Sequence, residues 1–420
     1  MGRAMQRFLM TAAVLFLVPV GVLCAEGDWS EFRGPLGNGH ANVQQAPVRW
    51  SQKENVFWKQ PLPGEGWSSP VLSEGKIYLT AAVPREGDEE NRYDLKLLVL
   101  SERTGAIEQQ VAIFEQSPEA PKIHNKNSHA SPTPLIEGDL VYVHFGHQGT
   151  ACVTRSGRIV WKNDTLAYKP VHGNGGSPII AGKSLVFSCD GASEPFVVAL
   201  DKHTGEELWR TTRQVEAPKK FSFSTPQLIV VGGKPQVISP GSNCVVAYNP
   251  QNGEEIWTVK YDGYSVIPRP VFLNGLLYVC TGYDSPSMIC IEPTGRGDVT
   301  ETHVKWVIRK GVPHTPSLLA LETEIYMVSD RGVASCIDAA SGETHWQQRL
   351  GGKYSASPIL AAGNIYFQSE DGVTTVVRPG RTYQMIAVNE MQDERTLASL
   401  AVAENTFYIR TDKHLYRIGK

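Results

Sequence analysis

Apolar residues recur along this chain in short runs that are separated by polar turns. The stretch from Pro178 to Phe187 is typical, because two apolar runs flank Gly182 within it. Branched apolar residues favour strands, and glycine accepts the positive φ that a tight turn requires. The pattern therefore predicts many pairs of short antiparallel strands.

These strand pairs repeat along the chain, and most of them open beside a proline. From Pro178 onward the opening prolines are 42 to 48 residues apart, which is the length of one four-stranded propeller blade. An eighth unit, Ala398–Ala401, keeps the pattern without a proline. The seven opening dipeptides are Ser69-Pro70, Thr133-Pro134, Ser177-Pro178, Thr225-Pro226, Arg269-Pro270, Thr315-Pro316 and Ser357-Pro358.

A third strand in most units ends in a polar turn with a glycine, and a tryptophan follows four residues later. A large ring on the outermost strand can pack against the neighbouring blade and hold the stack together. The tryptophans are therefore expected to be structural. The pairs are Gly157/Trp161, Gly205/Trp209, Gly253/Trp257 and Gly342/Trp346.

The two ends of the repeat region predict how the ring closes. The last unit stops at Leu415–Ile418, a third strand without an outer strand, whereas Asn55–Gln60 has the outer-strand pattern without a blade before it. Pairing the two segments satisfies both unpaired edges. The expected fold is all-β: an eight-bladed β-propeller over residues 52–420, with four-stranded antiparallel blades and an N-terminal strand that closes the last blade.

The repeat resembles a known family. The pattern Ala-x-Asp-x-x-Thr-Gly-x-x-x-Trp from Ala199 to Trp209 is similar to the tryptophan-docking repeat of the quinoprotein alcohol dehydrogenase-like superfamily, the PQQ-repeat β-propellers. The opening Asp28–Pro35 is similar to the arm that precedes many such propellers. The resemblance covers about residues 28–420, nearly the whole chain.

The resemblance implies one of two kinds of protein. Enzymes of the superfamily bind pyrroloquinoline quinone (PQQ) and calcium at the centre of the ring, and many carry an adjacent-cysteine disulfide; this sequence has neither that cysteine pair nor a Cys-x-x-Cys-His haem motif. Other members are non-catalytic, like the propeller lipoprotein of the outer-membrane β-barrel assembly machine. We therefore expect a binding scaffold without a cofactor, with a PQQ- and calcium-dependent oxidoreductase acting on an alcohol or sugar as the alternative.

The N-terminus predicts export. In residues 1–25, Arg3 and Arg7 flank the start of an apolar run, Phe8–Val22, that is too short for a membrane helix and resembles a signal peptide. Leu23 precedes Cys24, where lipid attachment requires a smaller residue. The expected protein is thus periplasmic or extracellular, with no membrane span and no lipid anchor, and residues 26–51 form a loop-rich arm.

Charge narrows the range of partners. The formal net charge is −3, with 40 basic and 43 acidic residues. Nucleic-acid binding relies on a concentration of positive charge, which this composition lacks. We expect instead that a protein or a small ligand binds over the loop-rich face, in a cell-envelope process; a structural module with a packed channel is a third interpretation.

In a propeller, the loops before each first strand gather at the mouth of the central channel. Six such segments are unusually polar or aromatic: His124–His129, His172–Gly176, Lys219–Phe223, Tyr264–Arg269, Pro313–His314 and Lys353–Ser355. From them we predict a ligand-binding set. Its members are His129, His172, Asn174, Arg269, His314 and Tyr354.

Arg269 stands where most units have Ser or Thr. Its guanidinium would suit a carboxylate or phosphate; alternatively, it bonds carbonyl groups of neighbouring blades and plugs the channel. His129, His172 and His314 could converge on a metal, but hydrogen-bonding loop residues explain them as well. We predict no metal site.

No residue stands out as catalytic. Acidic residues recur after the second strand of several blades, as turn residues do, whereas a general base should occur once. Cys280 and Cys290 could form a disulfide across one hairpin, but buried thiols acting as small apolar groups also explain the cysteines. The recurring acids are Asp190, Asp284, Asp330 and Asp371.

Overall fold

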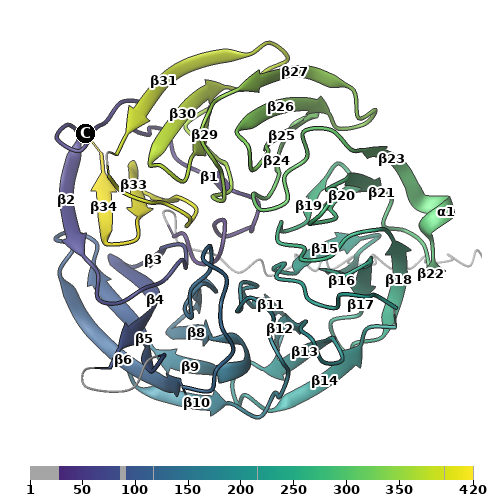
Figure 1. Cartoon of the computed structure of the whole chain (residues 1–420), viewed down its shortest axis with the longest axis horizontal. Coiled ribbons are helices and arrows are strands. Elements are labelled where there is room, and N and C mark those ends of the chain that lie inside the picture. The colour runs from purple at the N-terminus through teal and green to yellow at the C-terminus, as the bar shows by residue number, and fades with distance from the viewer. Residues whose placement is uncertain (1–27, 86–90, 117, 215, 392, 420) are drawn as a thin grey trace, which may run out of the picture.

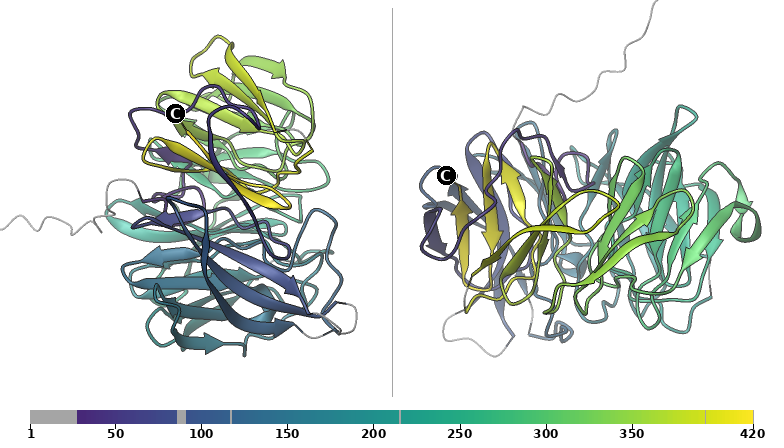
Figure 2. Two further views of the ribbon diagram at one scale, coloured as in Figure 1. Left: turned by 90° about the vertical axis from the view of Figure 1, so that its left-hand side faces the viewer. Right: turned by 90° about the horizontal axis from the view of Figure 1, so that it is seen from above.

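The computed structural model describes residues 28–85, 91–116, 118–214, 216–391 and 393–419. Eight β-sheets surround a central axis, and each is built around four antiparallel strands (Figure 1). Seen edge-on, the blades form one layer with connecting loops at both faces (Figure 2). The predicted eight-bladed propeller is confirmed. The expected signal peptide lies outside the described residues, and within them no helix has the length and apolar character needed to cross a membrane.

The first four blades contain consecutive strands of the chain. Their bounds are β3 (Val71–Ser73), β4 (Lys76–Pro84), β5 (Tyr93–Ser101) and β6 (Ile107–Gln116) in blade one; β7 (Leu135–Glu137), β8 (Leu140–His144), β9 (Thr150–Thr154) and β10 (Ile159–Asn163) in blade two; β11 (Ile179–Ala181), β12 (Ser184–Cys189), β13 (Phe196–Asp201) and β14 (Glu207–Thr212) in blade three; and β15 (Gln227–Val231), β16 (Lys234–Gly241), β17 (Cys244–Tyr248) and β18 (Glu255–Lys260) in blade four. A short 3₁₀ turn, η1 (Gly146–Gln148), connects β8 to β9.

Blades four and seven each gain a short fifth strand. The strand β22 (Gly297–Asp298) pairs with β18 of blade four, and β1 (His40–Ala41) pairs with the inner strand of blade seven. The remaining elements are β19 (Val271–Leu273), β20 (Leu276–Cys280), β21 (Met288–Ile291), α1 (Thr300–His303) and β23 (Val304–Ile308) in blade five; β24 (Leu319–Leu321), β25 (Glu324–Val328), β26 (Val333–Asp338) and β27 (Thr344–Arg349) in blade six; β28 (Ile359–Ala361), β29 (Asn364–Gln368), β30 (Val373–Arg378) and β31 (Gln384–Glu390) in blade seven; and β2 (Val56–Pro61), β32 (Ala401–Ala403), β33 (Thr406–Arg410) and β34 (His414–Ile418) in blade eight.

The ring closes through its N-terminal strand. β2 pairs antiparallel with β34, so that Lys59 lies opposite Tyr416, as the unpaired edges in the sequence indicated. A polar cluster reinforces the junction, because the Glu394 carboxylate accepts hydrogen bonds from the Lys59 ammonium at 2.8 Å and the Tyr416 hydroxyl at 2.7 Å. Segments from both ends of the propeller therefore complete blade eight.

Tryptophans join neighbouring blades. Trp209 on β14 lies against Gly253 of the next blade, where a Cβ atom would come within 2.4 Å of the indole ring and φ is +73°. The indole Nε1 also donates to the Pro250 carbonyl at 3.1 Å. Glycine is required there because it alone combines a positive φ with such a close approach. The same arrangement occurs at Trp58/Gly105, Trp161/Gly205 and Trp306/Gly342.

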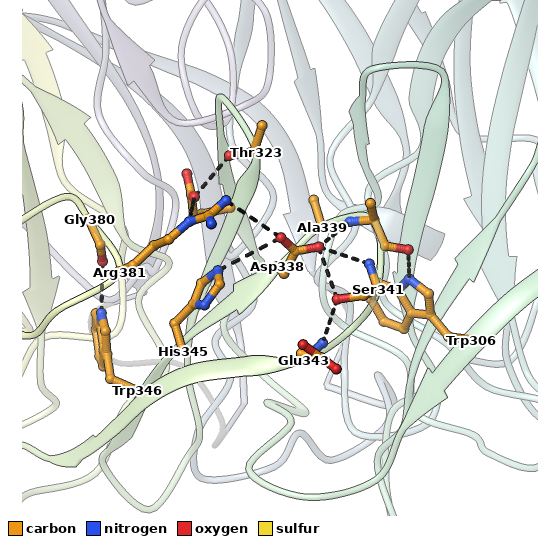
Figure 3. Close-up of polar contacts among 12 residues, drawn as sticks. Trp306, Thr323, Asp338, Ala339, Ser341, Glu343, His345, Trp346, Gly380 and Arg381 are labelled. Carbon is orange, nitrogen blue, oxygen red and sulfur yellow. Dashed lines mark hydrogen bonds and ion pairs between the residues drawn. The ribbon is translucent and has the colours of Figure 1, made fainter.

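Figure 3 shows how the turn that receives a tryptophan is built. Asp338 begins the turn of blade six and accepts hydrogen bonds from the backbone N–H groups of Ala340 and Ser341 at 3.1 and 2.9 Å. The Ala340 carbonyl then accepts the indole N–H of Trp306 from the preceding blade at 3.0 Å. The Asp and Gly of the repeat thus shape a docking surface for the neighbouring blade.

The N-terminal arm, residues 28–51, crosses one end of the channel. Trp29 pairs with Leu72 on the inner strand of blade one, and β1 runs parallel to β28 of blade seven. Trp50 then packs on Tyr366 and Phe407 at the junction of blades seven and eight. The arm thereby connects the inner strands of blades one and seven, which lie on either side of blade eight (Figure 1).

Candidate functional site

A cavity of about 730 Å³ lies on the axis of the propeller and is lined by residues from all eight blades and by Phe32 of the arm. We call it the axial cavity. The arm forms backbone hydrogen bonds with residues inside inner strands, such as Leu72 and Leu360. It therefore occupies one end of the channel. At the other end the lining includes Lys219 and Tyr283, which are exposed to solvent. The cavity therefore has one closed end and one mouth.

A ring of hydroxyl groups surrounds the cavity where the inner strands begin. In seven blades, the Ser or Thr at this position accepts a hydrogen bond from the backbone N–H of its counterpart in an adjacent blade; Ser69 N–H, for example, bonds Thr133 Oγ1 at 3.0 Å. We call these seven residues the hydroxyl belt. They are Ser69, Thr133, Ser177, Thr225, Ser317, Ser357 and Ser399.

The belt explains why Ser or Thr recurs before each inner strand, and it corrects one repeat boundary. In blade six the belt position is held by Ser317, which accepts the N–H of Arg269 at 3.0 Å. The dipeptide Thr315-Pro316, which the sequence pattern favoured, therefore lies two residues too early. Ser317-Leu318 opens this blade without a proline.

Arg269 occupies the eighth position of the ring and points away from the cavity. Its Nε donates to the Pro226 carbonyl at 3.1 Å, and its Nη1 donates to the Phe32 carbonyl of the arm at 2.7 Å. A third contact, of 3.4 Å, joins it to the Glu31 carboxylate, and the side chain of Arg269 is only 2% exposed. This geometry follows the plug interpretation, because Arg269 bonds a neighbouring blade and holds the arm.

Burial changes the ionisation of the groups around Arg269. It raises the pKa of the Glu31 carboxyl, an effect that the adjacent Arg269 only partly offsets. Burial, together with repulsion from Arg269, lowers the pKa of the Arg33 guanidinium to about 9. Arg33 is held by its bond to the Leu318 carbonyl at 2.6 Å. The closed end of the channel is thus a buried polar cluster in which Arg269 is fully bonded, whereas Nε and Nη1 of Arg33 have no partner among the described residues.

Six rings form a continuous arc around the mouth. Each contacts the next edge to face, with centroids between 5.3 and 5.7 Å apart, which is the favoured arrangement for aromatic pairs. All six line the axial cavity and come from the loops of blades two to six. We call them the aromatic arc; in order they are His124, His172, Phe221, Tyr264, Tyr283 and His314.

Two lysines belong to the lining. Lys219 donates to the Tyr264 hydroxyl at 2.7 Å and lies 4.1 Å from the centroid of that ring. Lys126 forms an ion pair of 2.6 Å with Glu370 of blade seven. Among the described residues that line the cavity there is no Asp or Glu. The lining therefore contributes positive charge and no negative charge.

The segment carrying Lys126 crosses part of the mouth. His124 N–H donates to the His172 carbonyl at 3.1 Å, which ties the segment to the loop before blade three. Arg395, in the loop between blades seven and eight, donates to the Asn125 carbonyl at 3.3 Å. Residues 123–127 thus connect distant blades and narrow the opening.

A family model described as "Outer membrane protein assembly factor BamB" matches residues 48–193, 120–318 and 318–415. The chain belongs to this BamB family. No curated protein matches it.

Solved structures share the propeller fold with this BamB-family chain at low sequence identity. BamB from Moraxella catarrhalis is 15% identical, with a TM-score of 0.59 over 86% of this chain and 99% of that one. Quinohemoprotein alcohol dehydrogenase ADHIIG from Pseudomonas putida HK5 is 12% identical, with a TM-score of 0.61 over 94% and 80%. The computationally designed protein Ika8 is 12% identical, with a TM-score of 0.59 over 86% and 100%. An assembly factor, an enzyme and a design thus share one architecture, so function must be argued from the site.

Two of the six predicted binding residues, His172 and His314, line the axial cavity. Asn174 lies beside it, where its side-chain oxygen accepts the Tyr168 hydroxyl at 2.6 Å. Tyr354 is 1% exposed and belongs to the core between blades six and seven. The positions of Asn174, Tyr354 and Arg269 therefore correct their expected place at the mouth.

His129 also lies away from the cavity. Its ring packs on Tyr93 at 4.9 Å, and burial lowers its pKa to about 4. His124, five residues earlier in the same loop, takes the predicted place beside His172. The loop was identified from sequence, but the residue within it depends on which way the backbone turns.

The alternative in which His129, His172 and His314 converge is wrong, because only His172 and His314 line the cavity. No group of three or more His, Cys, Asp and Glu side chains in the described part of the chain is placed to hold a metal. Calcium takes six to eight oxygen ligands, carboxylates prominent among them. The cavity lining lacks carboxylates, so its donor set does not fit the quinone-bound calcium of the enzymes that the sequence resembles.

The six described cysteines are free and buried. Cys280 lies opposite Met288, and Cys290 lies opposite Tyr278, so the two cysteines do not face one another across the hairpin. The disulfide considered from sequence is absent from the described residues, which leaves the buried-thiol interpretation.

The recurring acids do not share one role. Asp330 accepts the backbone N–H of His314, 16 residues earlier, at 2.8 Å, and so connects its turn to the loop before blade six. Asp190 instead forms a buried two-point ion pair with Arg213, at 2.8 and 3.0 Å.

Proposed function

We propose that this BamB-family propeller is an exported binding protein of the cell envelope that holds its ligand in the axial cavity. The observation that carries the proposal is a cavity closed by the arm at one end, open at the other and lined by every blade. Its volume of about 730 Å³ falls within the range of small-molecule sites, which combine aromatic walls with a few polar groups. The signal-like residues 1–25 support export.

The polar lining supports binding rather than bond-breaking chemistry. The histidines of the aromatic arc have neither a Ser nor a Cys nucleophile bonded to them among the described contacts, and His314 is engaged by Asp330 at 3.2 Å. Nucleophilic catalysis would need such a pair within hydrogen-bonding reach. A ligand held here would meet rings, hydroxyl groups and lysines.

The test is a variant that fills the cavity. Ile267 lines it and is half-buried, so Ile267→Trp should block the space, whereas Val230→Trp adds the same side chain at a position that is 58% exposed on β15. Titration calorimetry would compare both variants and the wild type against neutral and acidic oligosaccharides, peptides, and PQQ with and without calcium. We expect any ligand of the wild type to lose at least about tenfold in affinity for Ile267→Trp alone.

Binding that Ile267→Trp leaves unchanged would place the site on an outer surface and overturn the proposal. Stoichiometric PQQ uptake with turnover of an alcohol would instead establish the quinone-dependent oxidoreductase. Circular dichroism of both variants checks that they remain folded.

A further inference from the structure

We infer that the axial cavity binds an acidic saccharide: its acid group is held by the hydroxyl belt and Lys219, and its sugar rings pack on the aromatic arc. The inference rests on the proposed function, because it names the ligand class of the same cavity.

The hydroxyl belt supplies hydrogen-bond donors without protein acceptors. Each of its seven hydroxyl oxygens accepts a backbone N–H. A hydroxyl group has one proton to donate in addition to its lone pairs. Among the described residues none of these seven protons has a protein acceptor, and all seven groups line the cavity. A ligand that faces the belt must therefore be rich in acceptor oxygens.

The carboxylates nearest the cavity are already engaged. Glu370 accepts the Lys126 ammonium and the Ser355 hydroxyl, each at 2.6 Å. Glu31, in the arm, contacts Arg269, and Asp330 bonds His314. No Asp or Glu is among the described residues that line the cavity, so an anionic ligand group at the belt would contact donors and no protein carboxylate.

Lys219 supplies an available positive charge at the mouth. It is exposed, it donates to the neutral Tyr264 hydroxyl, and it forms no ion pair with a described carboxylate. Charge-assisted hydrogen bonds to an anion are about twice as strong as neutral ones. Lys219 therefore favours an acidic ligand over a neutral one of the same shape.

The aromatic arc defines the rest of the ligand. The C–H groups on one face of a sugar ring carry partial positive charge, and aromatic faces carry partial negative charge, so the two pack together. The hydroxyl groups of the sugar then face Asn127 and the hydroxyl belt, which line the same cavity. A lipid chain would leave the hydroxyl protons of the belt without acceptors. A flat aromatic acid has fewer oxygens that could accept hydrogen bonds from them. The volume suits a short oligosaccharide rather than a long chain.

The experiment compares trigalacturonic acid with its carboxyl-reduced neutral counterpart, by calorimetry on the mature protein at low and high salt. We expect the acidic trimer to bind about tenfold more tightly at low salt, and this preference to shrink as salt screens the exposed lysine. Lys219→Met should lower affinity for the acidic trimer about tenfold and leave the neutral trimer unchanged. Lys219→Arg should restore the preference, and Lys183→Met, in the exposed turn between β11 and β12, should have no effect.

Equal affinity for the two trimers, or no binding of either, would overturn the inference. If neither trimer binds while another ligand binds in a manner sensitive to Ile267→Trp, only this inference fails and the proposed function stands. If no ligand depends on Ile267, both fail.

Discussion

At the arm end of the channel, the Arg269 guanidinium is bonded through all three nitrogens, whereas around the axial cavity several polar groups have unused donors. Arg269 bonds two carbonyl oxygens and Glu31 at the closed end. The hydroxyl belt and Lys219 direct comparable groups toward the cavity. Unsatisfied buried donors destabilise a fold, so the bonds of Arg269 stabilise the closed end, whereas the donors that line the cavity can receive acceptors from outside.

The comparison also shows where asymmetry enters a repeat protein. Eight similar blades would produce a symmetric channel. The arm and the loops before each inner strand are not repeated, and these segments close one end and line the other with rings. In such a fold, function therefore depends on the segments that are not repeated.

The largest effect on stability is expected from a substitution at the closed end of the channel. Arg269→Ala removes the bonds to the Phe32 and Pro226 carbonyls and leaves Glu31 without its cation, so we expect the free energy of unfolding to fall by about 3 kcal/mol. Urea denaturation measures the loss, and limited proteolysis should show faster cleavage within residues 28–51. In the Glu31→Gln background the same change should cost less; an equal cost would mean that the ion pair contributes nothing.

An acid titration tests the polar cluster around Glu394, which reinforces the junction of β2 and β34 in blade eight. Burial alone would raise the pKa of Glu394, but hydrogen bonds from Lys59, Thr411, Tyr416 and His414 lower it to about 2. A carboxyl with a depressed pKa stabilises the fold above its unfolded value, and this contribution is lost as the pH falls through the folded value. We therefore expect a loss of about 2 kcal/mol between about pH 5 and pH 2, measured by urea denaturation at each pH.

The matched control for this titration is Glu394→Gln, which should be less stable at neutral pH and lack that part of the pH dependence. If both proteins lose stability with the same slope, Glu394 does not hold blade eight closed. Either result decides whether Glu394, which does not line the cavity, stabilises blade eight.

The smallest effect on stability is expected in the aromatic arc. Tyr283 is 47% exposed, so Tyr283→Ala should change the free energy of unfolding by less than about 0.5 kcal/mol. The same variant should weaken both trimers in the calorimetric comparison, because it removes a packing face and no charge. A large loss of stability would show that the aromatic arc stabilises the loops rather than being available to bind a ligand.

The sequence by itself determined the blade architecture, because each blade is built from local chemistry that recurs at each repeat. Turn glycines, Asp or Asn at the turn, and tryptophan four residues later predicted strands, turns and docking between blades. Closure followed from two unpaired edges, since a strand edge must find a partner. Even so, one boundary was misplaced: Thr315-Pro316 resembles the repeat dipeptide, but Ser317 makes the hydrogen bond.

Only the tertiary structure decided the composition of the site. Arg269 has the chemistry of a residue that binds an anionic ligand. Its partners Glu31 and Phe32, however, lie more than 230 residues away in the arm, and no local pattern in the sequence reveals that contact. His124 and His129 share one loop, and the turn of the backbone sends one to the cavity and the other toward Tyr93. Strands follow from short-range periodicity, whereas the direction of a loop side chain depends on which distant segments pack beside it.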